Sequence, residues 1–169
     1  GEDVVYARDW GYKDLRNMLP VDENTYSRTA SVTKMITGIG IMRLVDMGLL
    51  DLDEDISTYF GYKIANGRYP AIPLTLRQLM SHTSGIGVVD NACLAYPRRN
   101  MALADCAKSI LGTPLAWTPG TIFAYGPNSM QVAGAMAQRA TGQSWAKLVA
   151  SELTGPLQMT RTNYGINPN

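Results

Sequence analysis

A serine and a lysine three residues apart form the pair whose types and spacing point most directly to chemistry. Ser31 and Lys34 lie in the stretch SRTASVTKMITGIG, residues 27–40. On a helix, positions i and i+3 share one face, so the hydroxyl and the amine come within reach of each other. A serine hydroxyl is a weak nucleophile that needs a neighbouring base. A lysine is such a base where apolar surroundings and a helix N-terminus favour its neutral amine. The same spacing also describes a capping serine followed by an exposed lysine.

A tyrosine in a later loop is the second candidate for acid–base chemistry. Tyr125 lies in FAYGPN, residues 123–128, after a TPG turn. An aromatic side chain in a loop is the ordinary explanation. A phenolate beside a lysine ammonium would instead accept the proton of a serine and return it to the leaving group. The positive charge would favour the phenolate, because a nearby cation lowers the pKa of a tyrosine from about 10.

The single histidine is an alternative base. His82 lies in LMSHTSGI, residues 79–86, at the end of an expected helix. A serine–histidine–acid triad would need this residue as its base. Lys34 already provides a base beside Ser31, however, and the surrounding hydroxyl-rich segment is typical of a turn. We therefore expect His82 to be structural.

The elements that must position these residues follow from hydrophobic periodicity. Residues 3–12 alternate as in a strand, with a turn at Gly11, and residues 29–48 have the pattern of a helix. Apolar residues cover nearly the whole circumference of that helix, which predicts a central, buried element. Further helices are expected in the ranges 75–85, 101–111, 129–142 and 144–159. A single strand or hairpin is marginal in water, so the missing strands must come from elsewhere.

Composition narrows the class of protein. The 169 residues carry a net charge of +1 and 46% hydrophobic residues, as expected of one globular domain or slightly more. The sequence has no basic stripe of the kind that would indicate a nucleic-acid partner. The longest apolar run, MITGIGIMRLVDMGLL, is interrupted by Arg43 and Asp46, so we expect no membrane span. Gly1 leads directly into the expected strand, and any targeting segment is expected to lie outside this sequence.

Two cysteines leave two interpretations open. Cys93 and Cys106 are either buried free thiols or a disulfide that closes a short loop. A disulfide of this span would stabilise the fold by about 3 kcal/mol in the chain-entropy model. It would also indicate an oxidising compartment.

Three ordered blocks together resemble a known family. SVTKMITGIGIMRLVDMGLLDLDEDISTYF, LTLRQLMSHTSGI and PGTIFAYGPNSMQVAGAMAQRATGQSW are similar to the serine β-lactamase-like superfamily, from about Val4 to Leu157. That superfamily includes class C β-lactamases, D-alanyl-D-alanine carboxypeptidases and related carboxylesterases. The resemblance implies that Ser31 is the acylated nucleophile, Lys34 its partner and Tyr125 the second acid–base group. It implies no metal and no organic cofactor.

The resemblance also implies a fold. This is an α/β (α+β) fold, in which an antiparallel sheet is flanked by helices and joined by a mostly helical region. Residues 1–58 would belong to the α/β domain that carries the nucleophile helix, and residues 59–169 would form the helical domain that carries the tyrosine loop. Strands are missing at both ends, so we expect a second polypeptide or a missing C-terminal segment to complete the sheet.

The sequence departs from the family pattern in two ways, of which the first affects the expected substrate and the second the completeness of the fold. Proline stands at position 127, where lactamases and peptidases carry the asparagine of Tyr-x-Asn, and Asn128 comes one residue late. Proline has no donor for a substrate amide, which favours ester hydrolysis, and Asn128 is retained as a candidate substrate-binding residue. The late Lys/His-Thr/Ser-Gly-like motif is absent, and TRTNYG at 160–165 does not replace it.

The resulting hypothesis is a serine hydrolase that acts through an acyl-enzyme on a small ester or amide. Carboxylesterase or acyltransferase activity is expected first, and β-lactamase or D-amino-acid peptidase activity second. A non-catalytic, penicillin-binding-like scaffold is the alternative of a different class. We expect a secreted or periplasmic protein, with the cytoplasm as the other compartment.

Overall fold

The computed structural model describes residues 3–64, 68–87, 93 and 101–164. Contacts divide the chain into two compact units, Gly1–Val32 and Thr33–Asn169. Among the described residues, none of the helices is both long and apolar enough to cross a bilayer. The predicted domain boundary after residue 58 stays a prediction.

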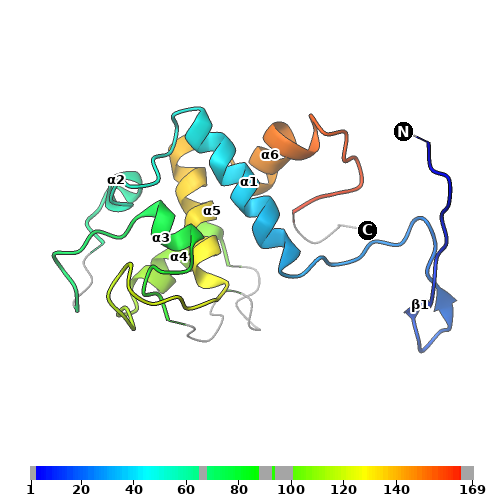
Figure 1. Cartoon of the computed structure of the whole chain (residues 1–169), viewed down its shortest axis with the longest axis horizontal. Coiled ribbons are helices and arrows are strands. Elements are labelled where there is room, and N and C mark those ends of the chain that lie inside the picture. The colour runs from blue at the N-terminus through cyan, green and yellow to red at the C-terminus, as the bar shows by residue number, and fades with distance from the viewer. Residues whose placement is uncertain (1–2, 65–67, 88–92, 94–100, 165–169) are drawn as a thin grey trace. The chain divides into compact units, whose positions relative to one another are not determined.

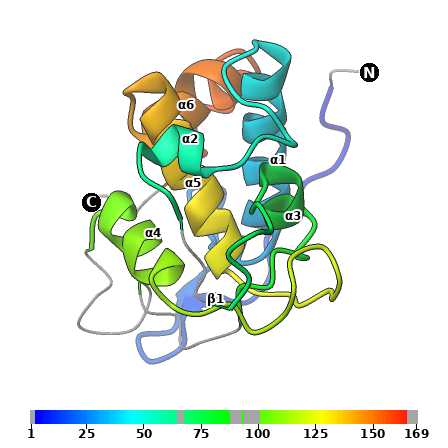
Figure 2. The ribbon, with the colours of Figure 1, turned by 90° about the vertical axis from the view of Figure 1, so that its left-hand side faces the viewer.

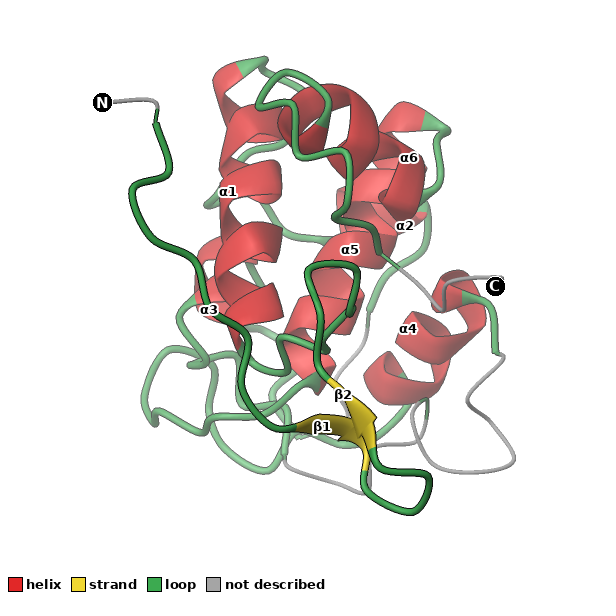
Figure 3. Ribbon diagram, turned by 90° about the vertical axis from the view of Figure 1, so that its right-hand side faces the viewer, coloured by secondary structure: helices red, strands yellow, loops and turns green. Residues whose placement is uncertain are grey.

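The first unit contains a short antiparallel hairpin (Figure 3). Strands β1 (Tyr12–Asp14) and β2 (Leu19–Pro20) pair with Tyr12 opposite Pro20 and with an irregular register towards Asp14. Gly11 has a φ of 80°, which fits the turn expected at this glycine.

The expected strand over residues 3–12 is wrong. Val4, Val5 and Tyr6 lie outside any strand and are 81%, 96% and 75% exposed. A strand forms only where a neighbour accepts its backbone hydrogen bonds, and the described part of the chain offers none to these residues.

The second unit is helical (Figure 1). Its elements, in order, are α1 (Val32–Asp46, which begins at the last residue of the first unit), α2 (Ser57–Phe60), α3 (Leu76–Met80), α4 (Leu103–Leu111), α5 (Asn128–Thr141), α6 (Trp145–Val149) and the π-helical turn η2 (Ala150–Thr154). Three of these helices, α1, α4 and α5, confirm the ranges expected from periodicity to within a few residues, whereas α3 is shorter than the expected 75–85. The helix expected over 144–159 is instead divided into α6 and η2 and ends before Gly155.

Helix α5 is the central element of the second unit. It packs against α2, α3, α4 and α6 (Figures 1 and 2). Trp145 of α6 packs closely against Gly134 of α5 and Gly40 of α1. A Cβ atom added at Gly40 would lie 3.0 Å from the Trp145 ring, and one added at Gly134 would lie 3.8 Å from it. Glycine at position 40 therefore lets the indole ring reach the α1 backbone, whereas 3.8 Å at Gly134 is an ordinary van der Waals contact.

Helix α1 is less buried than its composition predicts. Thr37, Gly40, Ile41 and Leu44 are its buried residues. Met35, Ile39 and Met42, here called the α1 apolar face, are 60%, 46% and 47% exposed. The expectation of burial on all sides is wrong for this chain, because the described residues supply packing partners for only one side of the helix.

Helix α3 shows how local signals set an element's ends. Thr75 and Gln78 form a reciprocal capping box at its start, as the expected cap at Thr75 requires. The helix ends at Met80 rather than near Gly85, since His82 adopts a left-handed conformation with a φ of 57°.

Candidate active site

A backbone ladder holds the histidine loop against the tyrosine loop. The loop 82–85 accepts three hydrogen bonds of 2.8 Å from the segment 116–124, which run from Ala124 to His82, from Gly120 to Thr83 and from Ala116 to Gly85. Beneath this ladder, the buried hydroxyls of Ser84 and Ser129 form a 3.1 Å hydrogen bond. These contacts tie the start of α5 and the preceding tyrosine loop to the end of α3.

Gly85 allows the two segments to approach this closely. Its φ is 78°, and a Cβ atom at this position would lie 2.2 Å from the carbonyl oxygen of Trp117. No side chain other than hydrogen fits such a space, so the glycine is required by both conformation and contact.

The structure brings together Lys34, His82 and Tyr125. Lys34 is the third residue of α1 and is half-buried, and its Nζ lies 4.9 Å from the centroid of the Tyr125 ring. The His82 ring lies 4.9 Å from the same ring at an interplanar angle of 51°. A cation at this distance from an aromatic ring is attracted by the π electrons, so the ring holds the ammonium beside the tyrosine loop.

His82 is buried in surroundings that favour its neutral form. It is 9% exposed, and its Nδ1 has no hydrogen-bond partner among the described residues. Burial lowers the pKa of His82, and the positive charge of Lys34 lowers it further. The ring also meets Phe123 edge-on at 6.0 Å. This apolar setting supports the predicted structural role.

Ser31 lies in the first unit, directly before the first residue of α1. Ala30, the residue before it, has a left-handed φ of 45°, and the N–H of Val32 donates to the carbonyl of Thr29 at 3.1 Å. A strained non-glycine residue beside a candidate nucleophile is a feature that clusters at functional sites. The place of Ser31 beside Lys34 and Tyr125 stays a prediction from its position in the chain.

The two residues of the modified Tyr-x-Asn motif begin α5. Pro127 occupies the N-cap position with a φ of −79°, close to the angle that its ring imposes. Asn128 is 5% exposed, and its Nδ2 donates to the carbonyl of Gly87 at 3.3 Å. This buried position favours a structural role over the predicted contact with substrate.

The remaining predicted residues form a disulfide. Cys93 and Cys106 are bonded to each other with a Cα–Cα distance of 5.6 Å. Cys106 belongs to α4 and is 1% exposed.

Sequence reasoning missed Tyr164. Its hydroxyl donates to the carbonyl of Thr33 at 2.9 Å and contacts the Thr37 hydroxyl, while its ring meets Trp145 edge-on at 5.8 Å. Tyr164 thus ties a late segment to the first turn of α1, next to Lys34. No local signal reveals this contact, because its partners are 131 residues apart.

The helical unit built around α5, with a lysine of α1 packed on a loop tyrosine, is the architecture of a β-lactamase-like protein. The sequence matches the Beta-lactamase family over residues 1–169, and the chain belongs to that family. The solved structure of a penicillin binding protein from Bacillus halodurans has a TM-score of 0.81 at 22% identity, covering 100% of this chain and 53% of that protein. The predicted fold class is therefore confirmed, and the chain covers part of the fold.

Two relatives share more of the sequence. Esterase EstB from Burkholderia gladioli is 32% identical over 171 residues, which cover 93% of this chain and 43% of EstB. Protein flp from Staphylococcus aureus (strain MRSA252) is 30% identical over 166 residues, which cover 98% of this chain and 33% of flp. The chain thus spans less than half the length of either relative.

Proposed function

We propose that the full-length protein is a serine hydrolase that cleaves a small ester through an acyl-enzyme. In this proposal the Ser31 oxygen attacks the ester carbonyl carbon. The Tyr125 phenolate, stabilised by the neighbouring Lys34 ammonium, takes up the serine proton and delivers it to the departing alkoxide. Water, or another acceptor alcohol, then attacks the acyl-serine and releases the acyl group. No metal or organic cofactor takes part in these steps.

The packing of Lys34 on Tyr125 is the observation that carries the proposal. The Nζ lies 4.9 Å from the ring centroid, although the two residues are far apart in the chain. Lys34 is half-buried in the first turn of the helix that follows Ser31. General acid–base catalysis requires hydrogen-bond reach between the exchanging groups in the substrate complex, and this contact already places the amine beside the phenol ring.

Two observations support an ester as the substrate. Pro127 removes the side-chain amide that would bind a substrate amide, and the burial of Asn128 makes it a poor replacement. EstB, at 32% identity, is named an esterase. β-Lactamase or D-amino-acid peptidase activity is the second candidate, favoured by the match to the Beta-lactamase family.

The test compares variants of the full-length protein on a chromogenic short-chain ester and a chromogenic cephalosporin. Ser31→Ala and Lys34→Gln should abolish ester turnover, and Tyr125→Phe, which keeps the ring, should lower it by about 10²–10⁴-fold. Lys147→Gln, an exposed lysine on α6, is the control and should behave as wild type. Turnover of the cephalosporin alone would refute the ester preference.

A covalent serine-reactive probe separates catalysis from a non-catalytic, penicillin-binding-like scaffold. The proposal predicts one adduct, located on Ser31 by peptide mass spectrometry and lost in Ser31→Ala. Absence of an adduct on the intact full-length protein would favour the scaffold and refute the hydrolase.

We further propose that a segment outside this sequence, in the same polypeptide or a second one, covers the α1 apolar face and completes the sheet. Contiguous exposed apolar surface of this kind marks an interaction site. Ile39 and Met47 are 46% and 45% exposed, but only Ile39 lies on this face. Ile39→Glu should therefore destabilise the full-length protein much more than Met47→Glu, and equal effects in thermal unfolding would contradict the proposal.

The disulfide supports a proposed secreted or periplasmic location. Disulfides persist in oxidising compartments and are rare in the cytosol. Intact mass of the native protein before and after reduction, together with cell fractionation, tests both points. A reduced, cytoplasmic protein would refute the proposal.

A further inference from the structure

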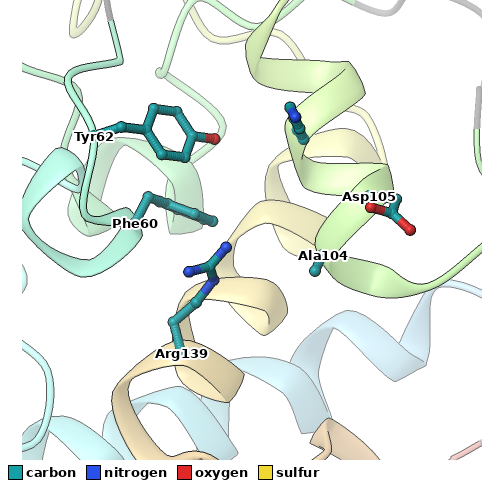
Figure 4. A pocket seen from close by; sticks show the side chains of 6 residues that line it. Phe60, Tyr62, Ala104, Asp105 and Arg139 are labelled. Carbon is teal, nitrogen blue, oxygen red and sulfur yellow. The ribbon is translucent and has the colours of Figure 1, made fainter.

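A cavity lies between α2, α4 and α5 (Figure 4). Its volume is about 470 Å³, within the range of small-molecule sites. It is lined by Phe60, Tyr62, Ala104, Asp105, Lys108 and Arg139, and is called here the α4–α5 pocket.

Two aromatic rings form one wall of the α4–α5 pocket. The centroids of the Phe60 and Tyr62 rings are 6.1 Å apart, with an interplanar angle of 56°. Phe60 is 4% exposed and is fixed by the core, while Tyr62 is 42% exposed. A tilted pair of this kind offers a planar, apolar group both a face and an edge to pack against.

Two cations face that wall. Lys108 and Arg139 belong to the last turns of α4 and α5. The negative end of a helix dipole favours a cation near the C-terminus, and this effect accounts for each residue taken singly. It does not explain why both line one cavity, nor why the Arg139 side chain reaches towards Phe60 (Figure 4).

The charge of the α4–α5 pocket is incompletely balanced. Asp105 is the single acidic residue among its lining residues. Within the described residues, neither Lys108 nor Arg139 forms an ion pair with a carboxylate. The net charge of the lining is therefore positive, and the guanidinium has the geometry to hold a carboxylate or phosphate with two parallel hydrogen bonds.

The α4–α5 pocket is separate from the candidate active site. Tyr125 precedes the first residue of α5, Asn128, whereas Arg139 comes near the helix's end. At about 1.5 Å per residue, these two ends of α5 are about 16 Å apart. A ligand in this pocket would not contact Lys34 or Tyr125.

We propose that the α4–α5 pocket binds a small anion carried on a planar apolar ring, such as an aryl carboxylate or an aryl phosphate. The anionic group lies between Lys108 and Arg139, and the ring packs against Phe60 and Tyr62. Charge and ring are both needed, because each wall of the pocket recognises a different half of the ligand.

The test measures binding of benzoate and phenyl phosphate to the full-length protein by calorimetry and NMR. Benzyl alcohol has the ring without the charge, and acetate has the charge without the ring. We expect benzoate or phenyl phosphate to bind at millimolar concentration or below, and the two partial ligands to bind at least about tenfold more weakly. The better of the two anions identifies the anionic group that the pocket prefers.

Variants assign that binding to the α4–α5 pocket. Arg139→Gln and Lys108→Gln should each weaken the binding by about tenfold, as expected for loss of a charge-assisted hydrogen bond. Lys147→Gln should leave it unchanged, and ester turnover should be unchanged in all three variants. The proposal is overturned if benzyl alcohol binds as well as benzoate, if both pocket variants bind as wild type does, or if neither anion binds.

Discussion

Replacing Gly85 by alanine is the most direct test of the loop geometry that holds Tyr125. Two costs follow from the structure. A left-handed φ of 78° costs an alanine about 1–2 kcal/mol. The new Cβ would also lie 2.2 Å from the Trp117 carbonyl oxygen, and nonbonded Cβ contacts below 3.0 Å essentially do not occur. The segment 116–124 must therefore retreat by about 0.8 Å.

That retreat weakens the ladder between the two loops. Its three backbone hydrogen bonds, each 2.8 Å long, contribute about 1 kcal/mol apiece. Gly48 provides a matched control, because its φ is 71° but nothing lies within 4 Å of an added Cβ. Gly48→Ala should lose only the stability that a left-handed φ costs an alanine. Gly85→Ala should also weaken the backbone hydrogen bonds, and should therefore be about 2–4 kcal/mol more destabilising.

The assay is equilibrium unfolding in urea, with ester turnover measured where both variants remain folded. Gly85→Ala should also lower kcat/KM, since the shifted segment moves Tyr125 away from Lys34, whereas Gly48→Ala should not. Equal losses of stability in the two variants would refute the claim that close contact, rather than φ alone, requires glycine at position 85.

Three further predictions concern the rest of the second unit. Because burial and Lys34 hold the pKa of His82 below its ordinary value of 6.5, the unfolded chain gains a proton first as the pH falls. The free energy of unfolding should therefore fall from about pH 6.5 downwards until the folded protein is also protonated, and His82→Phe should remove this loss in urea unfolding. Reducing the disulfide between Cys93 and Cys106 should lower the free energy of unfolding by about 3 kcal/mol, and Cys93→Ala should show no further change on adding reductant. Tyr164→Phe keeps the ring on Trp145 but loses the hydroxyl contact with Thr33, so thermal denaturation should show a loss of about 1 kcal/mol; an unchanged stability would mean that this contact contributes nothing.

Much of the helical pattern is local and was therefore predictable. The capping box at Thr75 joins residues three apart, and the glycine after α5, Gly142, adopts the left-handed conformation that ends a helix. The Ser31–Lys34 spacing is also local, because it is read directly from the sequence, but the place of Ser31 beside Lys34 stays a prediction. The three ordered blocks then identified the family, which the match over residues 1–169 confirms.

The environment of each candidate residue was decided by tertiary structure. Periodicity cannot show which side of an apolar helix finds a partner, so Met35 was expected to be buried and is 60% exposed. It also cannot show that Asn128 turns inward to Gly87, or that Tyr164 reaches Thr33. These contacts join distant residues, and packing of whole elements selects them.

The proposed chemistry depends on an ammonium at the start of a helix that packs on a phenol ring from a separate loop. The residue types and the spacing of Ser31 and Lys34 can be read from the sequence. Only the tertiary structure brings the Tyr125 ring to the Lys34 ammonium, because the two residues are far apart in the chain. Full turnover by a protein that lacks either group would remove the basis for the proposed chemistry.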